Sequence, residues 1–392
     1  MMKTRVITSI TALRQESQAW DALWEHSDSH SPLLRFCALE QYVMRFHPHD
    51  VFIALVVEDC ELAQGNKLAA ALPLVLRKKK MLPTIAALPN NEWLRCGDLM
   101  FDTRYDSEIL SNHVVAGLRG LDAHLLNLDW IDVNRECWDR ILASLHRQQL
   151  SFSARNKFTV GLTKLGFGID DLEQMLSKNR RKQLNRNLRD LRQGGRLELR
   201  LFEACDWEMA SQIVMEMEHA SWKGREKTSL VSAGMVDLYR NVWQALAARG
   251  EFIAWVLFHN GKAIAFDFGP CAKQVYSSLK IGYLEQYQEY SPGHLLYYLI
   301  IQQMTIDHDI QWIDTIGELT QATSRWTTDS YSLKKVSLPT AKFGSDQLFT
   351  LEQAMRSIKS CLHRPAHSLQ DRQLAPGLIP CATPSCTSTA SR

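Results

Sequence analysis

The fold of this chain is decided by residues 252–283, which read FIAWVLFHNGKAIAFDFGPCAKQVYSSLKIGY. Phe252–Phe258 and Ala263–Gly269 are two apolar and aromatic runs, and His259-Asn260-Gly261 between them is typical of a hairpin turn. Gln274–Ile281 contains several residues that favour strands and predicts a third one. The stretch therefore predicts an antiparallel meander of three strands.

Helices and further strands are expected around this meander. Ser291-Pro292 predicts the start of a helix over 292–308, because serine suits the N-cap and proline the first turn. The other elements expected in this half are a strand at 197–201, helices at 206–220 and 232–249, a strand at 311–316, a weak helix at 322–330 and a strand at 333–338.

The N-terminal half repeats this pattern. Phe52-Ile53-Ala54 recurs as Phe252-Ile253-Ala254, and each opens a strand that a turn (Gln64-Gly65-Asn66 in the first half) joins to a partner strand. Asp129-Trp130-Ile131-Asp132 is echoed by Gln311-Trp312-Ile313-Asp314, and each of these strands follows a helix. Two short matches in the same order, inside the same expected elements, favour a duplicated fold over two unrelated α/β domains.

Length and composition indicate the domain organisation. At ~100–200 residues per domain, 392 residues suggest two domains, which we place at 1–165 and 166–345. Residues 362–392 are rich in Pro, Ser, Thr and Ala without periodicity, so we expect a disordered tail.

Composition also excludes several classes of function. The net charge of +2 is too small to indicate nucleic-acid or membrane binding from the global field. The nine cysteines are dispersed, without a C-x-x-C pair, so neither a disulfide framework nor a metal site is expected. The N-terminus lacks the apolar core of a secretory signal, and no apolar run approaches the ~20 residues of a membrane-spanning helix. A soluble, cytoplasmic protein is therefore expected.

A basic amphipathic helix is predicted over 169–194. Within 178–192 it carries seven Lys or Arg residues against one acid, Asp190. A solvated helix face is the simplest interpretation. The functional alternatives are contact with an anionic glycan, with a phosphorylated or nucleotide-linked acceptor, or with tRNA.

The order of elements resembles the GNAT acetyltransferase fold, and several segments resemble one GNAT-like family in particular. That family includes the cellulose-biosynthesis acetyltransferase-like proteins and is related to the Fem peptidyltransferases, which also carry two GNAT-like halves. The resembling segments are Leu176–Leu184, the loop with Trp222 and Arg225, the strands of 252–281, and Tyr283 through Ser291–Leu296. The resemblance implies an α/β (α+β) fold of two tandem GNAT-like mixed-sheet domains, and it covers 170–340 better than 1–165.

The sequence departs from the GNAT pattern at two places. GNAT enzymes usually hold the CoA pyrophosphate with a Q/R-x-x-G-x-G/A loop, whereas Ser291-Pro292-Gly293 stands at that junction here. A Gly-rich stretch and a Tyr-Lys pair are expected after the late strand, whereas here Gly317-Glu318 is followed by Leu319–Ser324 and then Arg325-Trp326.

The resemblance implies acyl-CoA as the cofactor, without a metal, and places it in the second half. Ser291, Gly293 and His294 begin a helix whose free N–H groups suit a pyrophosphate, and Lys280 on the third strand is a second phosphate contact. The helix near Ser107 in the first half has no such glycine. The alternative for Ser291 is a plain helix cap.

Acyl transfer to an amine also needs a base, an acid and contacts for the acceptor. Asp267 and Glu318 are candidate bases, and Tyr276 is a candidate acid. The acceptor contacts expected by position are Trp222, Arg225 and Tyr283. The alternatives are an exposed strand face for Asp267 and aromatic core packing for the tyrosines.

The leading hypothesis is an acyltransferase that moves an acetyl or longer acyl group from acyl-CoA to an amine or hydroxyl, with exopolysaccharide or cell-envelope synthesis as the setting that the resemblance implies. The acceptor is then a small molecule or a glycan-type molecule. One alternative is a Fem-like transferase that uses aminoacyl-tRNA, which the basic helix supports and the near-neutral net charge disfavours. The other alternative is a degenerate GNAT that acts as a non-catalytic binding subunit.

Overall fold

The computed structural model describes residues 1–61, 68–78, 81–165, 176–306 and 310–362. Met1–Leu348 form one compact unit, and Phe349–Arg392 form a second one, with α12 (Ser345–Leu362) running across their boundary. The predicted turn at 64–66, the first part of the predicted basic helix (166–175) and the tail from residue 363 on lie outside the described residues.

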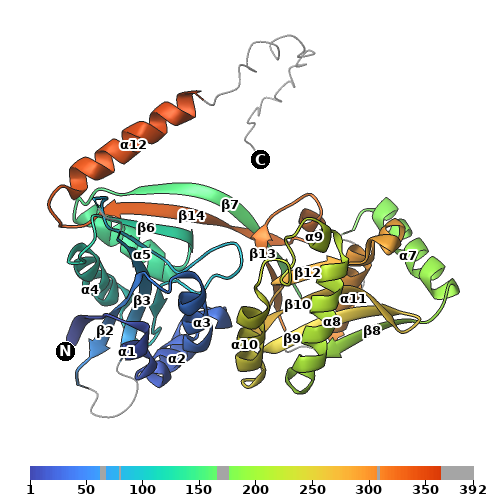
Figure 1. The fold of residues 1–392 in the computed structure, drawn as a ribbon. Coiled ribbons are helices and arrows are strands. Elements are labelled where there is room, and N and C mark those ends of the chain that lie inside the picture. Colours follow the sequence, from blue (N-terminus) through green and yellow to red (C-terminus); the bar gives the residue numbers. More distant parts are fainter. Residues whose placement is uncertain (62–67, 79–80, 166–175, 307–309, 363–392) are drawn as a thin grey trace, which may run out of the picture. The chain divides into compact units, whose positions relative to one another are not determined.

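The first unit is built on one mixed β-sheet (Figure 1). Its strands follow the order β1 (Met2–Ile7), β2 (Val51–Asp59), β3 (Leu68–Arg77), β4 (Ile85–Ala87), β6 (Leu125–Asp132), β14 (Asp329–Pro339), β7 (Ser153–Lys164), β13 (Trp312–Glu318), β11 (Val275–Ser277), β10 (Lys262–Ala272), β9 (Phe252–His259) and β8 (Leu197–Phe202). Two short strands lie beside this path: β5 (Met100–Phe101) pairs with β3, and β12 (Lys280–Tyr283) pairs with β10.

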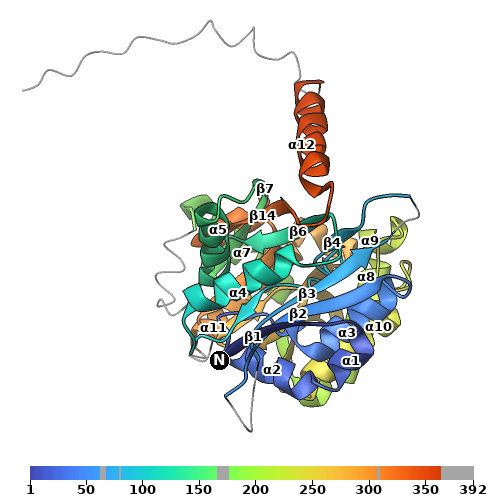
Figure 2. The same cartoon turned by 90° about the vertical axis from the view of Figure 1, so that its left-hand side faces the viewer.

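Helices cover both faces of each half of the sheet. In the first half, α1 (Ile10–Arg14), α2 (Ser17–His26) and α3 (Phe36–Phe46) pack on one face of β2, and α4 (Ser107–Arg119) and α5 (Glu136–Arg147) pack on the other (Figure 2). In the second half, α8 (Trp207–Ala220) and α10 (Val236–Ala247) cover one face of β9, and α7 (Lys178–Gln193) and α11 (Pro292–Ile306) cover the other. Each layer therefore buries alternate residues of its strands.

The duplicated α/β fold predicted from the sequence is confirmed. Phe52–Ala54 lies at the start of β2 and Phe252–Ala254 at the start of β9, and each strand pairs antiparallel with the next strand along the chain. The second echo also holds, since β6 pairs parallel with β4 and β13 pairs parallel with β11. Asp132 and Asp314 therefore lie on equivalent strands, Asp132 as the last residue of β6 and Asp314 as the last residue of β13 that pairs with β11.

Two long strands join the halves. β14 lies between β6 and β7, and β7 also pairs with β13, so the sheet is continuous from one half to the other (Figure 1). The predicted boundary between residues 165 and 166 stays a prediction. The structure adds that β14, from the end of the second predicted domain, lies beside β6 of the first.

The prediction of one strand over 274–281 is wrong, and this difference creates the site described below. β11 pairs with β13, and β12 pairs with β10, so the segment breaks into two strands with different partners. The break follows Ser277, whose carbonyl oxygen would lie 1.8 Å from a Cβ atom added to Gly269. The backbones therefore approach closely at a position that only glycine allows.

The weak helix predicted at 322–330 is also different in the structure. It is a short 3-10 turn over Thr323–Arg325, and β14 already begins at Asp329. The hydroxyl groups of Thr320 and Thr323 bond to nearby backbone groups, which favours a turn over a continued helix. In the described part of the chain, none of the helices combines the length and the apolar character that crossing a membrane requires.

Candidate functional site

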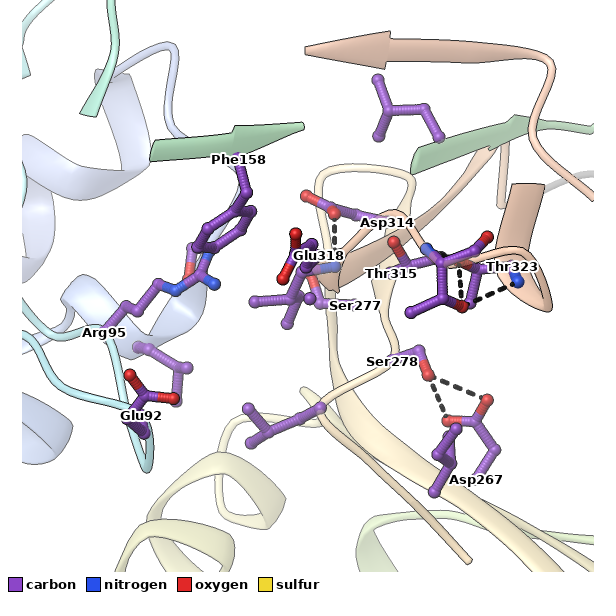
Figure 3. Close-up of a pocket in the computed structure, with 18 of the residues that line it drawn as sticks. Glu92, Arg95, Phe158, Asp267, Ser277, Ser278, Asp314, Thr315, Glu318 and Thr323 are labelled. Atoms are coloured by element: carbon purple, nitrogen blue, oxygen red, sulfur yellow. Dashed lines mark hydrogen bonds between the residues drawn. The ribbon is translucent and has the colours of Figure 1, made fainter. Parts of the chain in front are cut away.

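A cavity opens where β12 and β13 diverge. Ser277 still pairs with Asp314, and the N–H of Ser278 donates to the carbonyl oxygen of Asp314 over 2.8 Å. Beyond this point β12 continues beside β10, whereas β13 continues beside β7. The opening is part of a cavity of about 1150 Å³ that also reaches the loops at 28–34 and 90–98 of the first half (Figure 3).

One edge of β12 faces this cavity. The N–H of Leu284 donates to the carbonyl oxygen of Ile264 on β10, and backbone groups point alternately to the two sides of a strand, so those of Ile281 and Tyr283 point away from β10. The carbonyl oxygen of Ile281 indeed accepts from Lys223 Nζ at 2.7 Å. Ile281 and Tyr283 both line the cavity. This edge can pair with an extended ligand as a further strand would.

The start of α11 lies at the same cavity. Ser291 has a left-handed backbone (φ 51°, ψ 55°), and its carbonyl oxygen accepts from the N–H groups of His294 and Leu295. A Cβ atom added to Gly293 would meet only Tyr283 Cδ1, at 3.8 Å. Ser291, Gly293, His294 and Tyr283, all predicted from the sequence, therefore line one region of the cavity. The open space at Gly293 and the helix N-terminus suit an anionic group.

His294 lies between Arg180 and Trp326. Trp326 Nε1 donates to its Nδ1 over 3.2 Å, and Arg180 Nη2 lies 3.3 Å from its Nε2. A neutral imidazole accepts at one ring nitrogen, so the hydrogen is then on Nε2, and burial lowers the pKa of the imidazole. His294 is therefore suited to a neutral, structural position at the helix start.

Asp267 is a buried carboxyl group at the edge of the cavity. It accepts hydrogen bonds from Tyr276 Oη (2.8 Å) and from Ser278 Oγ (2.8 and 2.9 Å). Burial raises the pKa of Asp267 to about 6, against the lowering effect of these hydrogen bonds. Tyr276 is fully buried behind it and does not line the cavity, and burial raises the pKa of the phenol. The structure thus brings the two residues together but leaves only Asp267 at the cavity.

Of the other residues predicted from the sequence, two line the cavity and two do not. Trp222 and Glu318 line the cavity. Lys280 points elsewhere, with Nζ 4.6 Å from the ring centroid of Trp93, and burial lowers its pKa to about 8. Arg225, on the short helix α9 (Trp222–Arg225), forms an exposed ion pair with Glu285 at 2.5 Å and does not line the cavity.

Sequence reasoning missed a cluster that joins the two halves. Asp314 on β13 is almost fully buried, and its Oδ2 lies 3.1 Å from His30 Nε2 and accepts from Tyr331 Oη over 2.9 Å. Its Oδ1 accepts from the N–H of Ile316, whose φ is +53°. His30 is 37% exposed, so its imidazole is accessible from the cavity that it lines. The repeated Trp-Ile-Asp pattern was the only signal for Asp314, and nothing in the sequence singles out His30.

Arg95 is a second residue that sequence reasoning missed. Its guanidinium carbon lies 4.3 Å from the ring centroid of Trp130 and 5.3 Å from that of Phe158. Such stacking stabilises a cation by ~0.5–2 kcal/mol. Arg95 is partly buried, and this burial lowers the pKa of its guanidinium.

The described residues contain no group of three or more His, Cys, Asp or Glu side chains that could hold a metal ion. Among the acids and histidines of the cavity, His30 bonds to Asp314, Asp267 accepts from two hydroxyl groups, and His294 lies between Arg180 and Trp326. The chemistry that this arrangement supports is proton transfer and hydrogen bonding beside an open strand edge.

Comparison with known proteins supports the fold. Residues 178–321 match the family model of the acetyltransferase (GNAT) domain. A crystal structure of FemX has a TM-score of 0.54 at 10% identity, covering 89% of this chain and 99% of that chain. A conserved protein of unknown function from Bacteroides thetaiotaomicron has a TM-score of 0.52 at 11% identity, covering 87% of this chain and 100% of that chain. At such identities the likeness shows the fold alone. No curated protein sequence matches this chain.

Proposed function

We propose that this chain transfers an acyl group from acyl-CoA to an amine. The observation that carries the proposal is the separation of β12 from β13, which leaves a strand edge open inside a cavity where α11 begins. The match of residues 178–321 to the GNAT domain supports it, because GNAT domains generally bind acyl-CoA.

The residues present fit such a donor. The pantetheine arm is an extended chain with amide groups, and the backbone of Tyr283 and the N–H of Ile281 point away from β10 towards it, whereas the carbonyl oxygen of Ile281 already accepts from Lys223 Nζ. The pyrophosphate is an anion, and Gly293 at the start of α11 leaves space for one. Bound acyl-CoA supplies an activated thioester. Lys280 and Arg225 are not part of this proposed site.

In this proposal, one residue from each half of the chain takes part in proton transfer. His30 takes the proton that the amine loses as its nitrogen forms a bond to the acyl carbon, and the carbon–sulfur bond breaks to release a thiolate. Asp314 orients the imidazole and stabilises its charged form. The proton on His30 can then neutralise the thiolate, so the step balances without a covalent enzyme intermediate.

Asp267 has a supporting place in this proposal. Its carboxyl group fixes Ser278, the residue at which the two strands separate, while Tyr276 fixes Asp267 from behind. We assign Glu318, Trp222 and Tyr283 to the walls of the acceptor and donor sites, since all three line the cavity.

One observation favours a second candidate. The exposed Lys178, Lys182 and Arg192 of α7 have no ion-pair partner among the described residues, which suits an anionic donor such as aminoacyl-tRNA. Membership in the cellulose-biosynthesis acetyltransferase-like family, and a setting in exopolysaccharide or cell-envelope synthesis, rest on the sequence resemblance. The third hypothesis is a non-catalytic GNAT subunit, and it predicts that the protein does not bind acyl-CoA.

Calorimetric titration with acetyl-CoA tests the proposal. Gly293→Asp places a negative charge where the pyrophosphate is expected, and Gly293→Asn is its neutral control of the same shape. We expect saturable binding to the wild type, at least tenfold weaker binding to the Asp variant, and a smaller effect of Asn. A folded wild type that binds no acyl-CoA contradicts the proposal, and equal binding by both variants would displace the pyrophosphate from α11.

A further inference from the structure

Arg95 differs from the other cations of the cavity. Within the described ranges, no carboxylate oxygen lies within the 4.0 Å of an ion pair from its guanidinium. The other lysines and arginines that line the cavity are each paired: Arg135 with Asp28 and Asp98 (both 2.5 Å), Lys157 with Asp129 (3.4 Å) and Lys223 with Glu218 (3.1 Å). A partly buried cation that lacks a counterion gains more from an anionic ligand than a fully solvated cation does.

The position of Arg95 is fixed before any ligand arrives. The side chain of Asn90 accepts from the N–H of Gly97 and donates to the carbonyl oxygen of Gly97, both over 2.8 Å, and closes the loop that carries Arg95. A Cβ atom on Gly97 would lie 2.3 Å from Pro89 Cδ, so the loop is tightly packed. The rings of Trp130 and Phe158 hold the guanidinium itself. A site that is preorganised in this way loses little entropy on binding.

Arg95 belongs to the first half of the chain, whereas the proposed donor site belongs to the second. Figure 3 shows Arg95 and Phe158 on one wall and Asp314, Glu318 and Ser278 across from them. The proposed donor site uses β12 and the start of α11, which belong to the second half. An anion bound at Arg95 would lie among residues that the proposed donor site does not use.

We propose that Arg95 binds a carboxylate of the acceptor, so that the acceptor is an amine with a carboxylate in the same molecule. The assignment of this molecule as the acceptor rests on the proposed acyltransferase function, whereas carboxylate binding by Arg95 does not. Asp314 and Glu318 across the cavity suit the amine end, because they attract its charged form. The ammonium releases one proton to water, and His30 takes the second proton as the neutral amine forms its bond to the acyl carbon.

A carboxylate fits this position better than a phosphate does. The planar guanidinium matches the two oxygens of a carboxylate, and a monoanion needs one counter-charge. Glu92 and Asp314 are close enough to act on the charge of Arg95. A phosphate dianion at the same place would meet about twice the repulsion from these acids.

The test uses sodium acetate as the probe and the indole N–H signal of Trp130 as the readout. In protein labelled with ¹⁵N-tryptophan, the signal is identified by its loss in Trp130→Phe. Because Arg95 stacks on this ring, we expect acetate to shift the signal saturably in the millimolar range. Acetamide, the neutral analogue, should leave it in place, and inorganic phosphate should shift it less than acetate does.

Variants locate the effect. Arg95→Gln should abolish the acetate shift, and Arg95→Lys should weaken it roughly 10- to 100-fold, because the ammonium cannot bind both oxygens. Arg200→Gln is the matched control: Arg200 stacks on Phe258 at 4.6 Å but is exposed and does not line the cavity. No saturable acetate shift in the wild type overturns the proposal, and so does a shift that persists in a folded Arg95→Gln or a larger shift with phosphate.

A second experiment measures which acceptor the protein prefers. With acetyl-CoA as donor, glycine should be acylated with a lower KM than glycinamide, and Arg95→Gln should remove this preference while changing kcat little. If acetate shifts the signal but acetyl-CoA does not bind, the proposed acyltransferase function is refuted, whereas the proposed carboxylate site at Arg95 stands. If the protein acylates glycine and glycinamide equally well, the assignment of a carboxylate-bearing acceptor is refuted, whereas the proposed acyltransferase function stands.

Discussion

His30 and Asp314 are 284 residues apart in the sequence and 3.1 Å apart in the fold, measured between Nε2 and Oδ2. His30 belongs to a loop of the first half, and Asp314 is the last residue of β13 that pairs with β11 in the second. The pair therefore assembles only when both halves share one sheet.

The His30–Asp314 pair is expected to control the rate of acyl transfer. His30→Gln removes the base and should lower kcat roughly 100-fold, with little change in the Kd of acetyl-CoA. Steady-state kinetics and calorimetry measure the two quantities. The control is His47→Gln, since His47 forms a similar pair with Asp50 (2.9 Å) but does not line the cavity. Equal rates for the wild type and His30→Gln would exclude His30 as the base.

Asp267 should make the stability of the protein depend on pH. Its pKa in the folded protein is raised to about 6 from 3.8, so the folded state binds the proton more tightly than the unfolded state. Its stabilising effect is full below about pH 4 and is lost as the pH rises through about 6, and the total loss is about 3 kcal/mol in the free energy of unfolding. Urea unfolding at pH 4–8 should show most of this loss in the wild type but not in Asp267→Asn. Parallel curves for the two proteins would contradict the assignment.

Two ion pairs on α9 should differ in their effect on stability. Lys223 Nζ binds Glu218, which is 1% exposed, whereas Arg225 binds Glu285 and is 70% exposed. Lys223→Met leaves a buried charge without its partner and should lower the free energy of unfolding by about 3 kcal/mol. Arg225→Gln should change it by less than about 1 kcal/mol. Chemical denaturation measures both, and adding Glu218→Gln should restore much of the loss in the Lys223→Met protein.

Gly269 should be required for the separation of the strands. A Cβ atom there would lie 1.8 Å from the carbonyl oxygen of Ser277 and 2.9 Å from the N–H nitrogen of Leu279, so Gly269→Ala must displace the backbone at the cavity. We expect a loss of stability of about 2 kcal/mol or more and weaker acetyl-CoA binding. Gly120→Ala is the control, because its nearest contact would be 3.6 Å. Thermal unfolding that is unchanged in Gly269→Ala would contradict this account.

Much of the fold could be predicted because it depends on local patterns. The hairpin of β9 and β10 follows from two apolar runs around Asn260-Gly261, and Ser291-Pro292 marks the start of α11. The break between β11 and β12 was missed because strand propensity does not reveal which partner a strand chooses. Similarly, β14 lies beside β6 through long-range pairing that no local signal records.

The candidate site was predicted only where its residues are neighbours in sequence. Ser291, Gly293 and His294 lie together because they begin one helix. Tyr276 and Lys280 have side chains suited to an acid and to a phosphate contact, and they lie on strands next to the cavity. In the fold, however, Tyr276 packs behind Asp267, and Lys280 points towards Trp93.

By itself, the sequence determined the α/β class, the duplication and the helix start at Pro292, since each depends on the periodicity and turn chemistry of a short segment. Only the tertiary structure decided that β11 pairs with β13 whereas β12 pairs with β10, that His30 meets Asp314, and that Arg95 has no carboxylate partner in the part of the chain that the structure describes. These features depend on which distant groups share a cavity and on how much water is left around them. The energies of charges and hydrogen bonds vary with both, and neither is encoded in any single stretch of the chain.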